Sequence, residues 1–344
     1  MVVIVERPYL PQTNLMFGDN QELVTRRFAM IGLMKRLLLS LVVMCILAPI
    51  SATAQGFIAE EVQILLDPRY PAPNESFTAE LRDFGIRGVS GAIGWIIDGE
   101  VLDSSDRTIT LQAPPLGETV RIQALRGSEI VAEEIVRPAY LDVIVEPLTH
   151  TPSWFAGRSL ASPRSFVRLS AVVEESDRQP ANAYTYTWQI DQLMYGGGAL
   201  PSGQQITVQL PDRRAVLVYV TVSRPGVGTV ARRIIQIPTQ RPQLLFYPTN
   251  QIIFPRPIEG SYQMRNSELT LVAEPLYMSS ESLDRPFELH SEWKLNGRTV
   301  TPSGNLRQLT VQRAGGTGSA RVEYQLVDRE QLLQGARGSV RIQY

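Results

Sequence analysis

From Gln63 to the C-terminus, the chain alternates apolar and polar residues over short runs of about five to eight positions. Examples are ETVRIQAL (118–125), SFVRLSAVV (165–173) and RQLTVQR (307–313), and Pro, Gly, Asp or Asn separates successive runs. A period of two places one side of a strand in a core and the other side in water. Many short strands with turn residues between them predict an all-β sandwich or barrel.

Three units of similar order follow one another along the chain. Each unit has an opening aliphatic run that ends in proline, a second strand, a tryptophan strand, a threonine-bearing strand and a closing hairpin. The opening runs are VQILLDP (62–68), DVIVEP (142–147) and QLLFYP (243–248). Proline cannot donate to a central ladder, so each run predicts an edge strand that ends at the proline.

The tryptophans of the third strands are spaced roughly a hundred residues apart, which is the size of one small sandwich domain. We therefore expect three tandem antiparallel β-sandwiches, at residues 57–140, 141–240 and 241–344. The joints between them are short and contain proline, which restricts bending and predicts an elongated array.

A tryptophan on the third strand of a sandwich usually fills the core between the two sheets. We therefore predict a structural role in the core for Trp95, Trp188 and Trp293. The polar residues that follow them at the strand end, Asp98, Asp191 and Asn296, are predicted to begin turns.

The second of these strands, YTYTWQID (184–191), resembles the Tyr-x-Trp-x-hydrophobic-Asp-Gly strand of PKD domains and related bacterial immunoglobulin-like modules. The preceding FVRLSAVVEE is similar to the strand that comes before it in those families. The chain departs from the pattern at Gln192, where the family has glycine, and at Gly94, which replaces the aromatic pattern before the first tryptophan. Over residues 57–344, the resemblance implies PKD-like or immunoglobulin-like domains of an exported bacterial protein, used as binding or spacer modules.

The first 56 residues have a different pattern. Met34-Lys35-Arg36 precedes an apolar stretch at 37–50, and small residues follow at Ala52 and Ala54. A positive start, about 14 apolar residues and a small-x-small site are the layout of a secretory signal peptide. The sequence therefore predicts a signal-peptide helix at 34–54 that is cleaved after Ala54.

Two further expectations concern this N-terminal part. A signal peptide normally begins at its own methionine, so residues 1–33 are expected to be a spurious or disordered upstream segment. A spanning helix needs roughly 20 apolar residues, which favours cleavage over anchoring. The alternative is an uncleaved helix at 37–50 that anchors the chain in the inner membrane, and it is the only membrane contact that we expect.

Composition narrows the choice of partner. The chain has 344 residues and a formal net charge of −1, which gives no reason to expect nucleic acid. Charge is uneven, because residues 57–140 hold 14 acidic and 7 basic side chains. The single cysteine, Cys45, would leave with the signal peptide, which is compatible with an oxidising compartment.

Few residues could carry chemistry. A Ser-His-acid site would need His150 or His290 as its base, but His150 has no acid close in sequence and His290 lies on a predicted strand. Adjacent carboxylates such as Glu133 and Glu134 would point to opposite faces of a strand, so they do not form a glycosidase pair. We predict no catalytic residue, no cofactor and no metal site.

The most unusual feature is an enlarged first loop in the second and third units. From the opening proline to the alanine of the second strand, the chain advances 11 residues in the first unit, 24 in the second and 25 in the third. Large apolar side chains in a loop either pack onto the sandwich and its joints or meet a partner. The candidate partner-binding residues are Trp154, Phe155, Ile252, Ile253, Phe254 and Tyr262.

The sequence thus favours a non-catalytic exported protein, located in the periplasm, at the cell surface or outside the cell. It would act as a spacer, an adhesin or an accessory component of a cell-envelope assembly, through contacts with envelope proteins. One alternative is an array of glycan-binding modules, in which exposed aromatic rings stack on sugars. A carboxylate-dependent hydrolase is a further alternative, which would need two convergent acids.

Overall fold

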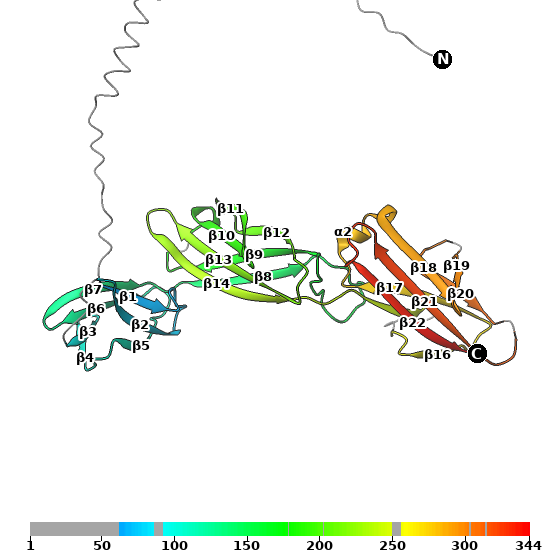
Figure 1. Cartoon of the computed structure of the whole chain (residues 1–344), viewed down its shortest axis with the longest axis horizontal. Coiled ribbons are helices and arrows are strands. Elements are labelled where there is room, and N and C mark those ends of the chain that lie inside the picture. The colour runs from blue at the N-terminus through cyan, green and yellow to red at the C-terminus, as the bar shows by residue number, and fades with distance from the viewer. Residues whose placement is uncertain are drawn as a thin grey trace, which may run out of the picture. The chain divides into compact units, whose positions relative to one another are not determined.

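A computed structural model describes residues 62–344, apart from 86–91, 178, 202, 250–255, 303 and 314. The predicted signal peptide, its cleavage site at Ala52 and Ala54 and the segment 1–33 lie outside the described residues. The described part is almost entirely β, and its sheets pair into three tandem β-sandwiches (Figure 1). The predicted fold class is therefore confirmed.

The first sandwich has one sheet of three strands and one of four. The three-stranded sheet has the order β1-β2-β5, formed by Val62–Asp67, Ser76–Asp83 and Thr108–Gln112. The other has the order β4-β3-β6-β7, formed by Glu100–Leu102, Ile93–Ile97, Val120–Arg126 and Glu129–Val136. All pairings are antiparallel, so one face of each sheet can be buried while the other meets water.

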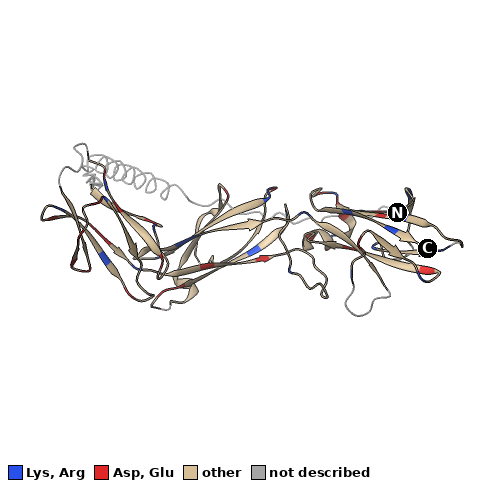
Figure 2. Ribbon diagram, turned by 90° about the horizontal axis from the view of Figure 1, so that it is seen from below, with Lys and Arg blue, Asp and Glu red and all other residues tan. Residues whose placement is uncertain are grey.

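The second sandwich repeats this arrangement. Its sheets are β12-β9-β8, formed by Gln205–Gln209, Phe166–Glu174 and Tyr140–Pro147, and β11-β10-β13-β14, formed by Leu193–Pro201, Thr185–Ile190, Ala215–Arg224 and Gly228–Pro238. A single turn of 3-10 helix, η1 (Ala181–Ala183), leads into the tryptophan strand β10. Figure 2 marks the acidic and basic residues on the ribbon, and they are interspersed along the strands and turns.

The third sandwich adds a strand. Its sheets are β15-β17-β20, formed by Gln243–Pro248, Glu268–Leu276 and Gln308–Gln312, and β16-β22-β21-β18-β19, formed by Ser261–Gln263, Gly335–Gln343, Ser319–Asp328, Leu289–Leu295 and Arg298–Val300. The short β16 comes from the enlarged first loop and pairs in parallel with β22. Two short helical turns, α2 (Ser280–Leu283) and η2 (Pro286–Glu288), precede β18.

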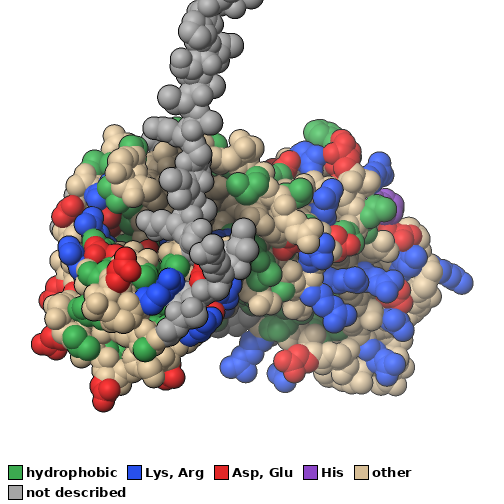
Figure 3. Space-filling view, turned by 60° about the vertical axis from the view of Figure 1, so that its left-hand side comes forward, with side chains coloured by type: hydrophobic (Ala, Val, Ile, Leu, Met, Phe, Trp, Pro, Cys, Tyr) green, Lys and Arg blue, Asp and Glu red, His purple; other side chains and the backbone are tan. Residues whose placement is uncertain are grey.

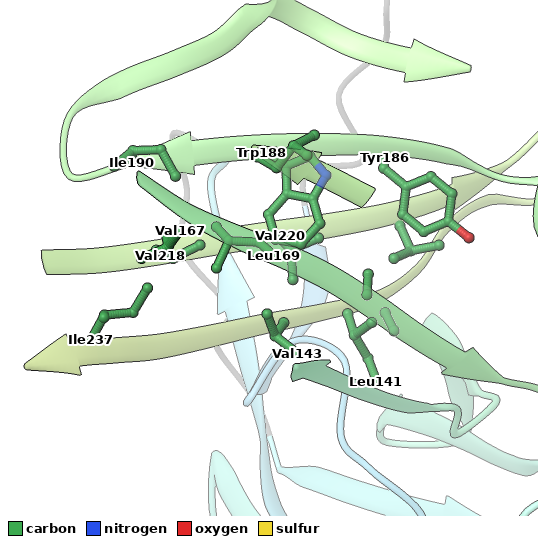
Figure 4. Packing of buried hydrophobic residues seen from close by; sticks show 14 of the residues in the cluster. Leu141, Val143, Val167, Leu169, Tyr186, Trp188, Ile190, Val218, Val220 and Ile237 are labelled. Carbon is green, nitrogen blue, oxygen red and sulfur yellow. The ribbon is translucent and has the colours of Figure 1, made fainter. Parts of the chain in front are cut away.

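Each sandwich has its own hydrophobic core around a buried tryptophan. Trp95 and Trp188 are 0% exposed and Trp293 is 1% exposed. In the second core, Trp188 lies among Leu169, Val220 and neighbouring side chains of both sheets (Figure 4). Apolar residues that alternate along facing strands thus meet in the middle of each sandwich.

The indole N–H of each tryptophan finds a partner of the same kind. It donates to a backbone carbonyl at 2.8 Å, in the turn that precedes the threonine-bearing strand; the acceptors are Asp106, Gly203 and Leu306. A buried donor without a partner is costly, so this bond lets the largest side chain of each core be fully enclosed.

A second shared feature follows each tryptophan strand. Asp98, Asp191 and Asn296 have φ near +50°, a left-handed conformation that Asp and Asn tolerate better than most residues. Each Oδ1 accepts a hydrogen bond from a backbone N–H near the start of the next long strand, namely that of Arg121, Leu217 or Arg321, at 2.8, 3.0 and 2.8 Å. The turn residue therefore links the tryptophan strand to its neighbour in the sheet.

This link predicts the effect of two substitutions at one turn. Asp98→Ala should lower the free energy of unfolding of the first sandwich by about 1–2 kcal/mol, because it removes the hydrogen bond and strains a residue at positive φ. Asp98→Asn should change it little, since Asn296 fills the equivalent position. Urea unfolding followed by hydrogen exchange of the β6 amides measures both. Equal losses in the two variants would mean that the carboxylate charge matters instead of the turn.

Candidate functional site

The enlarged first loop of the second sandwich lies against the third sandwich. The Trp154 ring meets the ring of Tyr247 edge-on, with centroids 4.6 Å apart, and Phe155 approaches Tyr277 at 6.4 Å. Edge-to-face packing is a favourable geometry for aromatic pairs. Trp154 nevertheless remains 40% exposed, so the loop both packs at the joint and presents an aromatic surface to solvent.

Main-chain hydrogen bonds cross the same joint. Thr149 and Ser279 form an isolated antiparallel bridge. Around it, the N–H of His150 donates to Met278 at 2.7 Å and the N–H of Tyr277 donates back to His150 at 2.9 Å. The opening strand β8 ends at Pro147. The N–H of Leu148 still donates to Phe166 of the same sheet, whereas its carbonyl accepts from Ser280 of the third sandwich.

Buried polar residues gather at this joint. The buried polar or charged side chains of the described residues all come from the first loop of the second sandwich or from facing segments of the third: Thr149, Ser162, Ser165, Glu274, Ser279, Ser282, Asp328 and Gln334. Polar groups are buried at a cost unless they are hydrogen-bonded. Their concentration at this joint indicates that the two sandwiches bury a specific polar interface between them.

Gln334 is the centre of this network. Its side chain is 0% exposed and donates to the carbonyl of Pro163 at 2.6 Å and to the hydroxyl of Ser162 at 3.0 Å. Its carbonyl oxygen accepts from the N–H of Ser279 at 2.6 Å. One side chain of the third sandwich therefore satisfies groups from both sandwiches.

The turn that carries Gln334 is held by a buried carboxylate. Asp328 is 0% exposed, and its Oδ1 accepts from the N–H groups of Glu330 and Gln331 at 2.9 and 3.1 Å. Its Oδ2 lies 3.5 Å from the guanidinium of Arg285. The hydrogen bonds to Oδ1, together with the one from the Asp328 N–H to the Gln334 carbonyl at 3.0 Å, hold the turn that places Gln334 in the interface.

A second polar cluster lies at the edge of the joint. His150 Nε2 is 2.5 Å from Glu274 Oε1, and the same oxygen accepts from Arg307 at 3.3 Å. Glu274 is 8% exposed. Nearby, burial raises the pKa of Tyr247 to about 12, and the charge of Glu274 and the neighbouring Tyr277 add to the effect. A buried carboxylate thus has two cationic or hydrogen-bonding partners, one from each sandwich.

The contact between the first and second sandwiches is different in kind. Cavities of about 660 and 360 Å³ lie there, lined by Arg69, Tyr70 and Leu66 of the first sandwich. Arg232 and Arg233 line the larger cavity from the second sandwich, and Arg232 stands 5.9 Å from the Tyr219 ring. Among the described residues, backbone hydrogen bonds of the loops join the second sandwich to the third, and no such bond joins the first sandwich to the second.

The remaining sequence candidates lie elsewhere. Ile252, Ile253 and Phe254 are outside the described residues. Tyr262 lies on β16 and packs against the core of the third sandwich. Whether any of the six residues binds a partner stays a prediction.

Sequence reasoning missed the contact of His150. The residue has no acid close to it along the chain, but Glu274 reaches it from 124 positions away. No local signal could show this, because strand pairing across two sandwiches brings the groups together. The unusual length of the first loop was the one indication that this segment does more than turn.

The adjacent carboxylates Glu133 and Glu134 have different partners. Glu133 accepts from Gln123 at 2.7 Å, whereas its neighbour Glu134 lies 3.7 Å from Arg69. Within the described ranges, no group of three or more His, Cys, Asp or Glu side chains could hold a metal ion, and no helix is long and apolar enough to span a membrane.

No protein-family model matches the chain, and no curated protein matches its sequence. Several solved structures of tandem domains are similar at low identity. The three N-terminal domains of the highly immunogenic outer capsid protein of bacteriophage RB49 are 14% identical, cover 82% of this chain and 97% of their own, and give a TM-score of 0.24. Immunoglobulin domains 1–4 of Sidekick-1 are 16% identical, cover 79% of this chain and 70% of their own, and give a TM-score of 0.19. The fibronectin(III)-like modules of Clostridium thermocellum CbhA are 10% identical, cover 52% of this chain and 94% of their own, and give a TM-score of 0.21.

The Gln334 network predicts that the second and third sandwiches unfold together. Gln334→Ala should leave Ser279 N–H and Pro163 C=O without partners and cost about 3 kcal/mol of coupling between the two sandwiches. Calorimetry should then show their joint transition split into two. Gln325→Ala, at an exposed position of β21, is the matched control and should leave the transition intact. An unsplit transition in Gln334→Ala would contradict the coupling.

Proposed function

We propose that this chain is a non-catalytic exported protein whose sandwiches act as a spacer and contact module in a cell-envelope assembly. The all-β tandem architecture fits a multi-domain module role. Export follows from the signal-peptide pattern at 34–54. The finer PKD-like assignment and the location in the periplasm, at the cell surface or outside the cell are parts of the same proposal.

The observation that carries the proposal is the joint between the second and third sandwiches. A chain that only connected two independent domains would need a short solvated linker, and domains joined in that way move freely by default. Here an enlarged loop, aromatic pairs and a buried polar network are devoted to holding two sandwiches together. Such an arrangement keeps a fixed separation between surfaces, which is what a spacer or scaffold requires.

The same loop supplies the contact surface in this proposal. Trp154 is 40% exposed although it packs on Tyr247, and aromatic residues are enriched where proteins bind each other. In the space-filling view of Figure 3, other hydrophobic side chains are scattered between charged ones on the visible face. We assign the partner surface to the Trp154–Phe155 tip. Ile252, Ile253 and Phe254 lie outside the described residues and belong to this proposal on the strength of their sequence alone.

A glycan ligand is the second candidate function. The half-exposed ring of Trp154 favours it, because an exposed aromatic face can stack on a sugar ring. A glycan array separates the two ideas. Binding that disappears in Trp154→Ala would support the sugar ligand, and an empty array would remove it.

Site-specific photo-crosslinking in living cells tests the protein partner. A photoreactive phenylalanine analogue in place of Trp154 should give an adduct with an envelope protein. The same analogue in place of Val101, which is 75% exposed on the first sandwich, is the control and should give none. Mass spectrometry of the product should also find an N-terminus at Gln55. Equal adducts at both positions, or an uncleaved cytoplasmic chain, would contradict the proposal.

A further inference from the structure

The threonine-bearing strand repeats one short pattern in the three sandwiches. β5 reads TITLQ, β12 reads QITVQ and β20 reads QLTVQ. Each lies at the edge of a three-stranded sheet and pairs on one side only, with β2, β9 or β17 (Figure 1). None of the three contains a charged residue or a proline. Such an edge can pair with another extended strand, and natural sheets usually protect their edges against this.

The pairing of β5 with β2 fixes the direction of its main-chain groups. The carbonyl of Arg107, just before β5, accepts from the N–H of Leu81 on β2 at 2.9 Å. Hydrogen-bonding direction alternates along an antiparallel strand, so every second residue from Thr108 directs its N–H and C=O away from β2. These residues are Thr108, Thr110 and Gln112, and all three are exposed. Among the described residues, none of their main-chain groups has a hydrogen-bond partner.

Other edges of the described sheets are protected. β4, β16 and β19 are three residues long and offer little to pair with. β11 is interrupted by a register shift at three glycines of positive φ, Gly196, Gly197 and Gly198. β1, β8 and β15 lie against β7, β14 and β22 of the opposite sheet. Short strands, bulges and covered edges all discourage pairing with another chain.

The two strands that share the pattern of β5 are partly used within their own sandwich. The hydroxyl of Tyr195 on β11 donates to the carbonyl of Thr207 on β12 at 3.1 Å. The N–H of Gln308 on β20 donates to the carbonyl of Asn305 in the preceding turn at 3.0 Å. Each bond occupies a group that an added strand would need. Among the strands that the structure describes, β5 therefore has the most open edge.

We propose that β5 pairs with the β5 strand of a second copy of this chain, antiparallel about a two-fold axis at Thr110. In this register Thr110 lies opposite its own copy, and Thr108 lies opposite Gln112 of the second copy. Every outward N–H of one strand then meets an outward carbonyl of the other. A contact of one surface with itself about a two-fold axis is the commonest symmetry of protein dimers.

The side chains of β5 suit a second copy on both faces of the sheet. Ile109 is 6% exposed and Leu111 packs against the same core, so the two apolar layers continue across the contact. On the outer face threonine meets threonine, as Thr270 and Thr310 do in the third sandwich, where their hydroxyls are 2.8 Å apart. Since the strand has no charged side chain, no like charges lie directly opposite each other.

The strength of this contact depends on salt. A pair of five-residue strands is a small interface, which gives weak association. Residues 57–140 hold 14 acidic and 7 basic side chains, so two first sandwiches repel each other at long range. Salt screens this repulsion, and the dimer is therefore stronger at higher ionic strength. The contact is separate from the Trp154 surface, so either can fail without the other.

Sedimentation of the full chain over a range of concentrations tests the proposal. The wild type should show a monomer–dimer equilibrium that salt shifts toward the dimer. Thr110→Pro removes the N–H at the axis, and an edge strand tolerates proline where its N–H faces solvent. The dimer dissociation constant should rise about ten- to a hundredfold. Thr207→Pro makes the same change in the closed edge of β12; this matched control should leave the dissociation constant unchanged.

A second variant covers the case in which proline disturbs the fold. Thr110→Lys keeps the N–H but places two positive charges opposite each other at the axis, and it should weaken the dimer in the same direction. The near-ultraviolet circular dichroism of the buried tryptophans shows whether each variant is folded. A wild-type chain that stays monomeric, or a dimer that folded Thr110→Pro and Thr110→Lys both leave intact, would overturn the proposal.

Thr110→Cys tests the register. In the proposed pairing the two Cα atoms at this position are about 5.5 Å apart, which a disulfide can span. Mild oxidation should therefore give a covalent dimer. Thr207→Cys is the control, and because both variants keep Cys45, the difference between them reports the new cysteine. No more covalent dimer from Thr110→Cys than from Thr207→Cys would contradict the two-fold pairing.

Discussion

The structure depends on enclosing a tryptophan between two sheets while its single N–H donor remains hydrogen-bonded. In each sandwich the donor is satisfied by a backbone carbonyl at 2.8 Å, and the ring is then free to fill the core. A buried Trp contributes roughly 3–5 kcal/mol relative to Ala. The bond also fixes the turn before the threonine-bearing strand, so packing of the core and connection of the two sheets are one event.

The same requirement, that a buried polar group must have a partner, explains the joint. Glycine-rich or solvated linkers leave domains free, but Gln334, Ser162 and Asp328 are enclosed where two sandwiches meet. The hydrogen bonds from Gln334 to Ser162 and Pro163 form only when the second and third sandwiches are in one arrangement. The contact of the first sandwich with the second contains cavities instead of a buried network. Among the described residues, the buried polar side chains are therefore concentrated at the interface between the second and third sandwiches.

Much of the fold was predictable because its signals are local. Alternation along ETVRIQAL and SFVRLSAVV predicts strands that the structure contains as β6 and β9. The parallel strand β16 and the short helices α2 and η2 were not predicted. They are too short to show a period, and β16 exists only because β22 offers a free edge to it. The candidate loop was recognised by its length and its aromatic residues, but not by what it contacts.

The sequence by itself determined the all-β class, the three tryptophan-centred sandwiches and the unusual first loops. These depend on residue periodicity, on the size of a sandwich and on spacing, all of which are written along the chain. Only the tertiary structure decided that Trp154 meets Tyr247, that Gln334 is shared between two sandwiches and that His150 contacts Glu274. Those contacts join residues more than ninety positions apart, and their energies come from burial and hydrogen bonding that exist only once two separate cores have formed side by side.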